Sequence, residues 1–273
     1  MAKRISVLTA ILLSFALGCR QRREPAHTAP TAVPTVAPQA PAAAPDAAPA
    51  ASVVDAALAR GRDAAELPKD PPGFYMGRRM ATTMSHEGAD WLTRPSRARE
   101  ENPQKLMAAL ALKPGDVACD FGAGNGYHTL MMATSVAPNG RAVAADLQPQ
   151  MLSLLQARAR AAHVSNVETV QSTVDDPKFA PASCDVILIA DVYHELSDPA
   201  AVLAQLKTAL SPRGTLAIVE FRAEDPAVPV KVLHKMSKAQ ILRELTANGF
   251  ALVRTVDDLP WQHVMFFAVQ ATP

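Results

Sequence analysis

The stretch of sequence with the most chemical content is residues 117–126, where a short apolar run leads into three glycines at alternate positions. Gly122, Gly124 and Gly126 have no Cβ atom, so the backbone there can adopt positive φ angles and approach a ligand closely. A helix that begins directly after them offers free N–H groups to the same ligand. A dehydrogenase loop needs a small residue where Tyr127 stands, and a phosphate-binding loop needs Gly-Lys-Ser/Thr, which is missing here. The loop therefore favours a cofactor site of another kind.

Two acidic residues accompany this loop: Asp120 precedes the glycines, and Asp146 closes the next expected strand. Together with the glycine spacing they resemble the first two motifs of class I S-adenosylmethionine-dependent methyltransferases, in the small-molecule branch that includes uncharacterised bacterial members. The resemblance implies S-adenosyl-L-methionine as cofactor, with Asp146 accepting hydrogen bonds from both ribose hydroxyls and Asp120 fixing the loop or the methionine amino group. Asp146 could alternatively cap the helix that follows it. The residues expected to bind the cofactor are Asp120, Gly122, Gly124, Gly126, Asp146, Leu147, Thr173, Asp175 and Asp191.

The adenine side of this expected site departs from the family pattern. The position that usually carries an acidic partner for the adenine amino group holds Thr173. We therefore expect either Asp175 or the Thr173 hydroxyl to take that role.

The segment after the fourth expected strand carries the candidate catalytic residues, Asp191, Tyr193 and His194. Ligands of doubly wound sheets bind beyond the carboxyl ends of the strands, so Asp191 and His194 are expected to face the transferred methyl group. His194 titrates near neutrality and could take a proton from an attacking oxygen or nitrogen. In the alternative, Tyr193 and His194 only wall the cofactor pocket. The segment lacks the Asn/Asp-Pro-Pro-Tyr/Phe sequence of enzymes that methylate nucleobase or amide nitrogen, which argues against such substrates.

No metal site is expected, because the histidines are scattered along the chain and the pair His86-Glu87 has no further ligands nearby in sequence. Cys119 lies late in one expected strand, and Cys184 starts another that runs parallel to it. We therefore expect their Cα atoms to be farther apart than the ~7 Å limit for a disulfide. Both are expected to be unpaired, buried and apolar in behaviour. Arsenic methylation, which would need three cysteines, is accordingly not expected.

From Asn102 onward, apolar runs alternate with helical stretches, and this alternation predicts a parallel α/β sheet. A last helix is expected from a cap at Ser237 to Asn248, followed by two strands. The resemblance implies a Rossmann-like sheet of seven strands, mostly parallel, with a C-terminal antiparallel strand. The expected strands are residues 117–121, 142–145, 167–171, 186–190, 215–220, 251–256 and 264–270.

Residues 1–19 have the features of an export signal, with Lys3 and Arg4 before an apolar run. The end of this segment resembles a bacterial lipoprotein box, which implies a lipid anchor on Cys19. This predicts an exported, membrane-anchored lipoprotein of the cell envelope or periplasm. Ordinary signal cleavage and a misassigned start codon are alternatives, and the protein would be cytoplasmic if the signal is not used.

The expected domains after the signal are a Pro/Ala-rich disordered linker (20–51), a helical N-terminal cover (52–101) and the methyltransferase domain (102–273). Met76, Met80 and Met84 are spaced by four residues, which indicates an amphipathic helix in the cover. That cover is expected either to pack against the domain or to form a substrate lid, and residues 220–235 are expected to close over the substrate with it.

The formal net charge of +1 provides no field that would attract a nucleic acid, so the expected partner is a small molecule. The favoured function is methyl transfer from S-adenosylmethionine to an oxygen, nitrogen or carbon nucleophile. Two rivals remain. One is a catalytically silent binding module in the envelope, since S-adenosylmethionine is made in the cytoplasm. The other is an NAD-dependent oxidoreductase, which Tyr127 disfavours.

Overall fold

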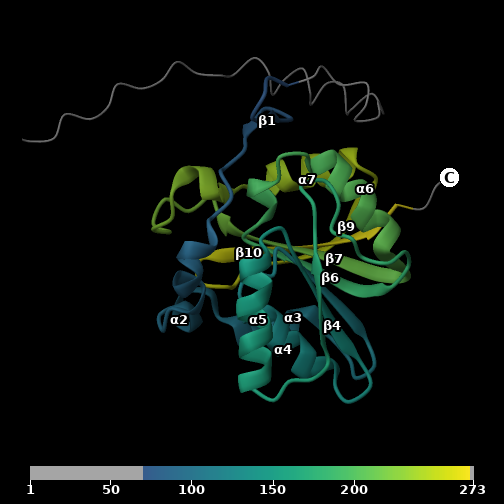
Figure 1. The fold of residues 1–273 in the computed structure, drawn as a ribbon. Helices are drawn as coiled ribbons and strands as arrows, with labels where there is room; N and C mark the ends of the chain where they lie inside the picture. Colours follow the sequence, from purple (N-terminus) through teal and green to yellow (C-terminus); the bar gives the residue numbers. More distant parts are fainter. Residues whose placement is uncertain (1–69, 271–273) are drawn as a thin grey trace, which may run out of the picture. The chain divides into compact units, whose positions relative to one another are not determined.

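The computed structural model describes residues 70–270, and a twisted sheet with helices on both faces forms the centre of this part (Figure 1). The strand order is β5-β4-β3-β6-β7-β10-β9, and the short β8 (Lys235–Met236) pairs with β7 outside this path. β10 is antiparallel to both of its neighbours, and all other pairs in this sheet are parallel. The expected seven-stranded, mostly parallel sheet is confirmed. Its strands are β3 (Val117–Phe121), β4 (Arg141–Asp146), β5 (Val167–Gln171), β6 (Cys184–Ala190), β7 (Leu210–Arg222), β9 (Phe250–Val256) and β10 (Gln262–Val269).

Alternation along the strands explains why helices cover both faces. In β6, Ile187 and Ile189 pack in one apolar cluster with α6 and α7, whereas Leu188 packs in another with α3 and α4. Both faces are therefore buried, as expected for a parallel sheet. The helices are α3 (Pro103–Leu110), α4 (Tyr127–Val136) and α5 (Pro149–Ala161) on one face, and α6 (Pro199–Ala209) and α7 (Lys238–Ala247) on the other (Figure 1).

α3 and α7 both begin with a side-chain cap, and the one at Ser237 was expected. The Asn102 side chain accepts a hydrogen bond from the backbone N–H of Lys105, and Pro103 occupies the first turn of α3. At α7, the Ser237 hydroxyl accepts from the backbone N–H of Gln240. The first cap sets the start of α3, directly after the cover, and the second sets the start of α7, the last helix before β9 and β10.

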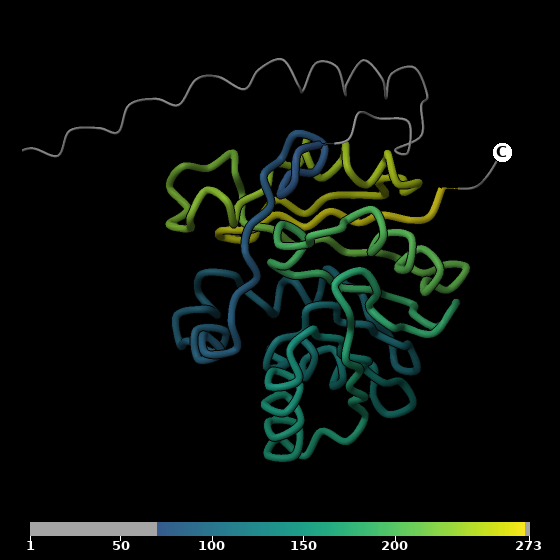
Figure 2. The backbone as a smooth tube through the Cα atoms, turned by 45° about the horizontal axis from the view of Figure 1, so that its top comes forward, coloured from purple at the N-terminus to yellow at the C-terminus, as the bar shows by residue number. Residues whose placement is uncertain are grey.

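The described part of the cover differs from the expected amphipathic helix. Gly73 and Gly77 have φ angles of 82° and 81°. β1 (Phe74–Tyr75) lies between them and β2 (Arg78–Arg79) directly follows Gly77, and the two strands form a small hairpin. A 3-10 helix, η2 (His86–Thr93), and the short α2 (Arg97–Glu101) follow. Figure 2 shows this segment running past the sheet from the hairpin near α7 towards α5. The methionine spacing therefore predicted the wrong element, because glycines with positive φ turn the chain back on itself.

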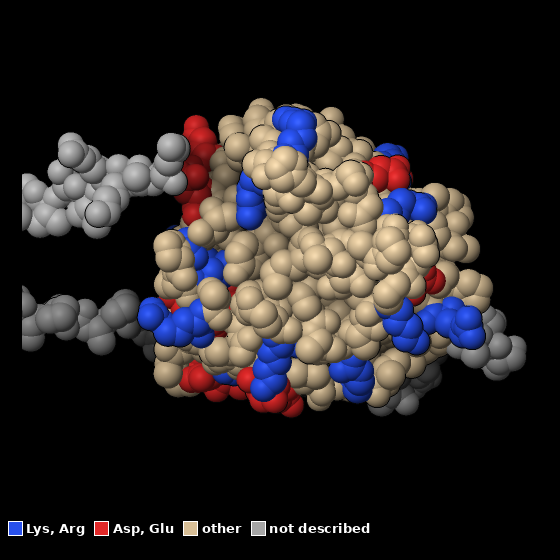
Figure 3. Space-filling view, turned by 90° about the horizontal axis from the view of Figure 1, so that it is seen from below, with Lys and Arg blue, Asp and Glu red and all other residues tan. Residues whose placement is uncertain are grey.

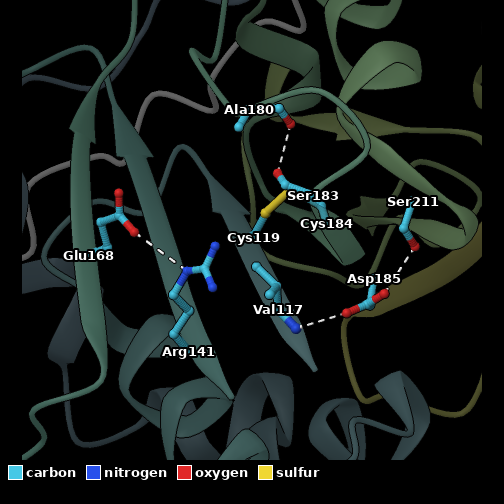
Figure 4. The surroundings of a disulfide bond; sticks show 9 residues. All are labelled: Val117, Cys119, Arg141, Glu168, Ala180, Ser183, Cys184, Asp185 and Ser211. Atoms are coloured by element: carbon cyan, nitrogen blue, oxygen red, sulfur yellow. Dashed lines mark hydrogen bonds and ion pairs between the residues drawn. A yellow bond between two sulfur atoms is a disulfide. The ribbon is translucent and has the colours of Figure 1, made fainter. Parts of the chain in front are cut away.

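The expectation of two unpaired cysteines is also wrong. Cys119 and Cys184 form a disulfide, with their Cα atoms 5.8 Å apart (Figure 4). The parallel pairing of β3 with β6 begins only at Ala118 and Val186, so Cys184 precedes it and its distance from Cys119 is not set by the regular strand register. The side chain of Asp185, the residue after Cys184, accepts a hydrogen bond from the backbone N–H of Val117 in β3. Both cysteines are fully buried, as expected.

The expected signal, the linker and residues 52–69 of the expected cover lie outside residues 70–270. Within that range, no helix combines the length and the apolar character needed to cross a membrane. On the face seen in Figure 3, lysine and arginine side chains stand scattered among uncharged residues, with acidic side chains between some of them. The described part of this face therefore offers no continuous basic surface to a polyanion.

Candidate active site

A cavity of about 500 Å³ lies beyond the carboxyl ends of β3, β4, β5 and β6, where ligands of doubly wound sheets bind. Residues 120–124, 146–148, 172–174 and 190–192 line it from these strand ends. Residues of the cover, among them Trp91 and Leu92, and of the segment 229–234 line it as well. Both segments that were expected to close over a substrate thus border the cavity.

The three glycines of the loop after β3 have different structural roles. Gly122 and Gly124 line the cavity with φ angles of 74° and 54°. A Cβ atom on Gly122 would lie 2.5 Å from Val192. Gly126 caps α4 and is absent from the cavity lining; a Cβ atom there would lie 2.5 Å from Leu155 of α5. Gly126 is therefore required for helix packing, and the structure shows no direct approach of this residue to the expected cofactor site.

Asp146 organises the loop while it faces the cavity. Its Oδ2 accepts the backbone N–H of Gly124 and its Oδ1 that of Gln148, each at 2.8 Å. Gln148, not Asp146, is the N-cap residue of α5. Burial raises the pKa of Asp146. Because each carboxylate oxygen can accept two hydrogen bonds, both oxygens retain capacity for the two hydroxyls of a ribose.

Asp120 lies behind the loop with only 3% of its surface exposed. Its Oδ2 accepts a 2.5 Å hydrogen bond from the Thr129 hydroxyl on α4. Burial raises the pKa of Asp120 to about 6, although the hydrogen bond from Thr129 opposes the shift. A cationic group placed beside Asp120 would favour its ionised form.

At the expected adenine side, Thr173 and Leu147 line the cavity and Asp175 does not. The Thr173 hydroxyl donates to Asp175 Oδ1 at 2.7 Å, so the acidic group orients the threonine instead of facing the cavity. Ser172, which the sequence did not single out, is buried and lines the cavity beside Thr173.

The structure separates the three candidate catalytic residues. Asp191 lines the cavity in a left-handed conformation with φ of 55°, and its Oδ2 accepts from Gln262 at 2.7 Å. Asp191 Oδ1 is buried without a hydrogen-bond partner among the described residues. Burial raises the pKa of Asp191 well above its ordinary value. Tyr193 is fully buried in the core beside α6 and α7 and does not line the cavity, so the structure does not bring this catalytic candidate to the site.

The short 3-10 turn η3 (Tyr193–Glu195) causes this separation, because Tyr193 packs into the core while the next two residues line the cavity. His194 Nδ1 lies 2.6 Å from Glu220 Oε2, and its Nε2 lies 3.0 Å from His234 Nδ1. Burial alone would lower the pKa of His194, but the charge and hydrogen bond of Glu220 outweigh burial and raise it. Burial raises the pKa of Glu195 to about 7, and burial followed by the charge of His194 lowers that of His234.

Several residues of this site were missed from the sequence. Glu195 directly follows His194 on η3, whereas His234, on η4 (Val232–His234), reaches His194 only through the fold. Arg97 also lines the cavity. Its Nε lies 2.7 Å from Glu101 Oε2, and its guanidinium carbon lies 4.1 Å from the centre of the Tyr127 ring. Glu195 could have been found from its position next to His194, but His234 and Arg97 could not, because spacing along the chain does not report contacts between distant segments.

Comparison with known proteins identifies the family. A family model described as a methyltransferase domain matches residues 112–262. The chain is 30% identical over 116 residues to the ubiquinone/menaquinone biosynthesis C-methyltransferase UbiE of Shewanella frigidimarina, which is 42% of this chain and 46% of that enzyme. It is 28% identical over 117 residues to an arsenite methyltransferase of Halobacterium salinarum, which is 43% of this chain and 29% of that enzyme. The chain thus spans less than half the length of these two relatives.

The fold is also similar to that of a solved methyltransferase structure. A crystal structure of a SAM-dependent methyltransferase from Aquifex aeolicus superposes with a TM-score of 0.64 at 24% identity, over 68% of this chain and 98% of that one. This likeness concerns the architecture. Because the family match extends over more than half of the sequence, the chain belongs to the class I S-adenosylmethionine-dependent methyltransferase family.

Proposed function

We propose that this chain transfers the methyl group of S-adenosylmethionine to an oxygen, nitrogen or carbon nucleophile of a small molecule. The observation that carries the proposal is a single cavity that contains the glycine loop and Asp146 together with Asp191 and His194. Its volume of about 500 Å³ falls in the usual range for small-molecule sites. A cavity bordered by the cover and by residues 229–234 suits a small substrate better than a polymer.

The residues present fit this cofactor. Both oxygens of Asp146 can accept further hydrogen bonds, and Gly122 and Gly124 leave the loop backbone without side chains beside the cavity. Asp120 and Arg97 place charges of opposite sign near the loop, which suits the amino and carboxylate groups of a methionine moiety. When bound, the cofactor supplies an electrophilic methyl group on a sulfonium. The chain's own part is to orient the two reactants and exclude water, which by itself can account for much of a rate enhancement.

Arsenic is a poor candidate substrate in this site. Cys119 and Cys184 form a disulfide in the core and do not line the cavity. Thiolates for a soft ligand are therefore lacking in the described part of the site, although one relative bears the name of an arsenite methyltransferase.

Calorimetric titration of the full chain with S-adenosylmethionine tests the proposal. The wild type should show saturable binding, and Asp146→Asn should bind roughly 10- to 100-fold more weakly because a charged acceptor is lost. Asp258→Asn, which removes an exposed carboxylate outside the cavity lining, should bind like the wild type. Equal binding by Asp146→Asn would contradict the proposed site. Binding of NAD in its place would favour an oxidoreductase, and binding of neither would favour a silent module.

We also propose that the chain is exported and anchored through a lipid on Cys19. The proposal is supported by the signal-like residues 1–19 and by the disulfide, since disulfides persist mainly in oxidising compartments. Membrane fractionation of cells that express the wild type or Cys19→Ala tests the anchor. The wild type should sediment with membranes and the variant should not; a wild type found only in the soluble fraction would refute the anchor.

A further inference from the structure

Three side chains at one end of the cavity present their ligand atoms to a common point. His194 Nε2 lies 3.0 Å from His234 Nδ1, and Glu195 Oε1 lies 3.8 Å from each of these nitrogens. A point equidistant from the three atoms in their plane is about 2.1 Å from each, which matches Zn–N and Zn–O bond lengths. We infer that His194, Glu195 and His234 bind a divalent transition-metal ion, with zinc as the best match.

The surroundings of His194 support this inference independently of the distances. Metal-binding histidines commonly donate their second ring N–H to a carboxylate, which fixes the tautomer and orients the ring. Glu220 is in that place: it is fully buried, its Oε2 lies 2.6 Å from His194 Nδ1, and its Oε1 accepts the backbone N–H of His194. In the neutral ring the lone pair is then on Nε2, which is the atom that faces His234 and Glu195.

The donor set and the setting indicate which metals fit. Two imidazoles and one carboxylate suit zinc and similar transition metals, whereas magnesium and calcium prefer oxygen ligands alone. All three residues line the cavity, so the ion's remaining coordination position would open towards a substrate. Three protein ligands with one open position are the pattern of catalytic zinc sites, while structural sites are closed by four.

The open position suggests a substrate class, and this step rests on the proposed methyl transfer. A hydroxyl or thiol that binds zinc has a lower pKa and releases its proton to solvent near neutral pH. The deprotonated oxygen or sulfur then bonds to the methyl carbon as the carbon–sulfur bond of the sulfonium breaks, and S-adenosylhomocysteine leaves. The metal site thus favours small molecules with an ionisable hydroxyl or thiol as substrates.

Metal binding can be measured without any methyl transfer. The full chain, stripped with a chelator and dialysed, is titrated calorimetrically with zinc and, for comparison, with magnesium. We expect one zinc site, weakened at least about 100-fold in His234→Ala and Glu195→Gln, and weakened about 10- to 100-fold in Glu220→Gln. His163→Asn removes an exposed histidine outside the cavity and should leave zinc affinity unchanged. Cobalt(II) should give the visible absorption of a four-coordinate site in the wild type and lose it in His234→Ala.

The outcomes separate the metal site from its alternatives. An absence of saturable zinc binding, or unchanged binding in His234→Ala, would overturn the inference and leave the two rings as a hydrogen-bonded pair. Loss in His234→Ala also excludes zinc held by Cys19 or His27, which lie outside the described residues. Circular dichroism checks folding, which should persist because the His234 side chain is 31% exposed. Zinc binding in a chain that fails to bind S-adenosylmethionine would support the metal site and contradict the proposed function.

Discussion

Among single residues, Asp120 should make cofactor binding sensitive to pH. Burial raises its pKa to about 6, so in the empty protein it is largely protonated below that pH. A bound cationic amino group would require the carboxylate, and binding below pH 6 would therefore release a proton. We expect the affinity for S-adenosylmethionine to rise by roughly tenfold per pH unit up to about pH 6 and then to level off. Calorimetry in buffers of different ionisation enthalpy would detect the proton release directly.

The charged groups around Asp120 allow this prediction to be assigned to one residue. Asp146 and Arg97 are the charged neighbours that affect its pKa most, and burial lowers the pKa of His128 well below its usual range, which keeps that ring neutral. Asp120→Asn should bind the cofactor more weakly at pH 7 and lose the pH dependence between 5 and 6. The same slope in the variant would assign the proton to another group.

Some residues of the site can be predicted from the sequence, and others cannot. Asp146 and Gly122 could be identified because a strand end and a tight backbone turn restrict which residue types are accepted there. Tyr193 could not be placed, because a single 3-10 turn decides which of two neighbouring side chains enters the core. The contact between His194 and His234 depends on how distant segments pack, and no local pattern reports that.

Among the elements, the hairpin β1–β2 shows how the cover is fastened to the domain. Arg78 makes two hydrogen bonds to the carboxylate of Glu244 on α7, at 2.8 and 3.0 Å, and the Glu244 side chain is fully buried. Methionine spacing alone predicted a helix here, but the glycines on either side of β1 favour a turn, and this ion pair fixes the hairpin to α7. The backbone conformation of the two glycines and the ion pair with α7 therefore determine this segment, and the methionine spacing does not.

Removal of Arg78 should destabilise the fold markedly. Arg78→Ala leaves the Glu244 carboxylate buried without its partner, which typically costs about 3–5 kcal/mol. Urea unfolding should show this as a lower midpoint at an unchanged slope. Arg79→Ala, on the exposed side of the same strand, should change the free energy of unfolding by less than about 0.5 kcal/mol. If both variants unfolded at the same midpoint, the ion pair would not be what fastens the cover.

In the whole molecule, the alternation of strands and helices was sufficient to predict the sheet. Strands that are buried on both faces need runs of apolar residues, and each parallel connection needs a helical stretch between two such runs. The order of apolar runs and helical stretches in the sequence therefore predicts the sheet. The disulfide could not be predicted in this way, because Cys184 lies before the regular pairing of β6 with β3 and its position is not given by the strand register. That bond ties β3 to β6 at the centre of the sheet, and it also links stability to the compartment in which the chain folds.

The disulfide should make stability depend on export. Its cysteines are 65 residues apart, and a cross-link that closes such a loop stabilises a protein by ~4 kcal/mol in the chain-entropy description. A chain produced with residues 1–18 should carry the oxidised pair, whereas a chain that begins at Cys19 and stays in a reducing cytoplasm should carry two thiols and unfold at a lower urea concentration. Thiol alkylation followed by mass measurement reports the redox state, and urea unfolding with and without reductant reports the stability. A Cys119→Ala/Cys184→Ala double variant should be insensitive to reductant. If the oxidised and reduced wild type unfolded at the same urea concentration, the packing of β3 against β6 would be sufficient without the bond, and the fold would be equally stable in either compartment.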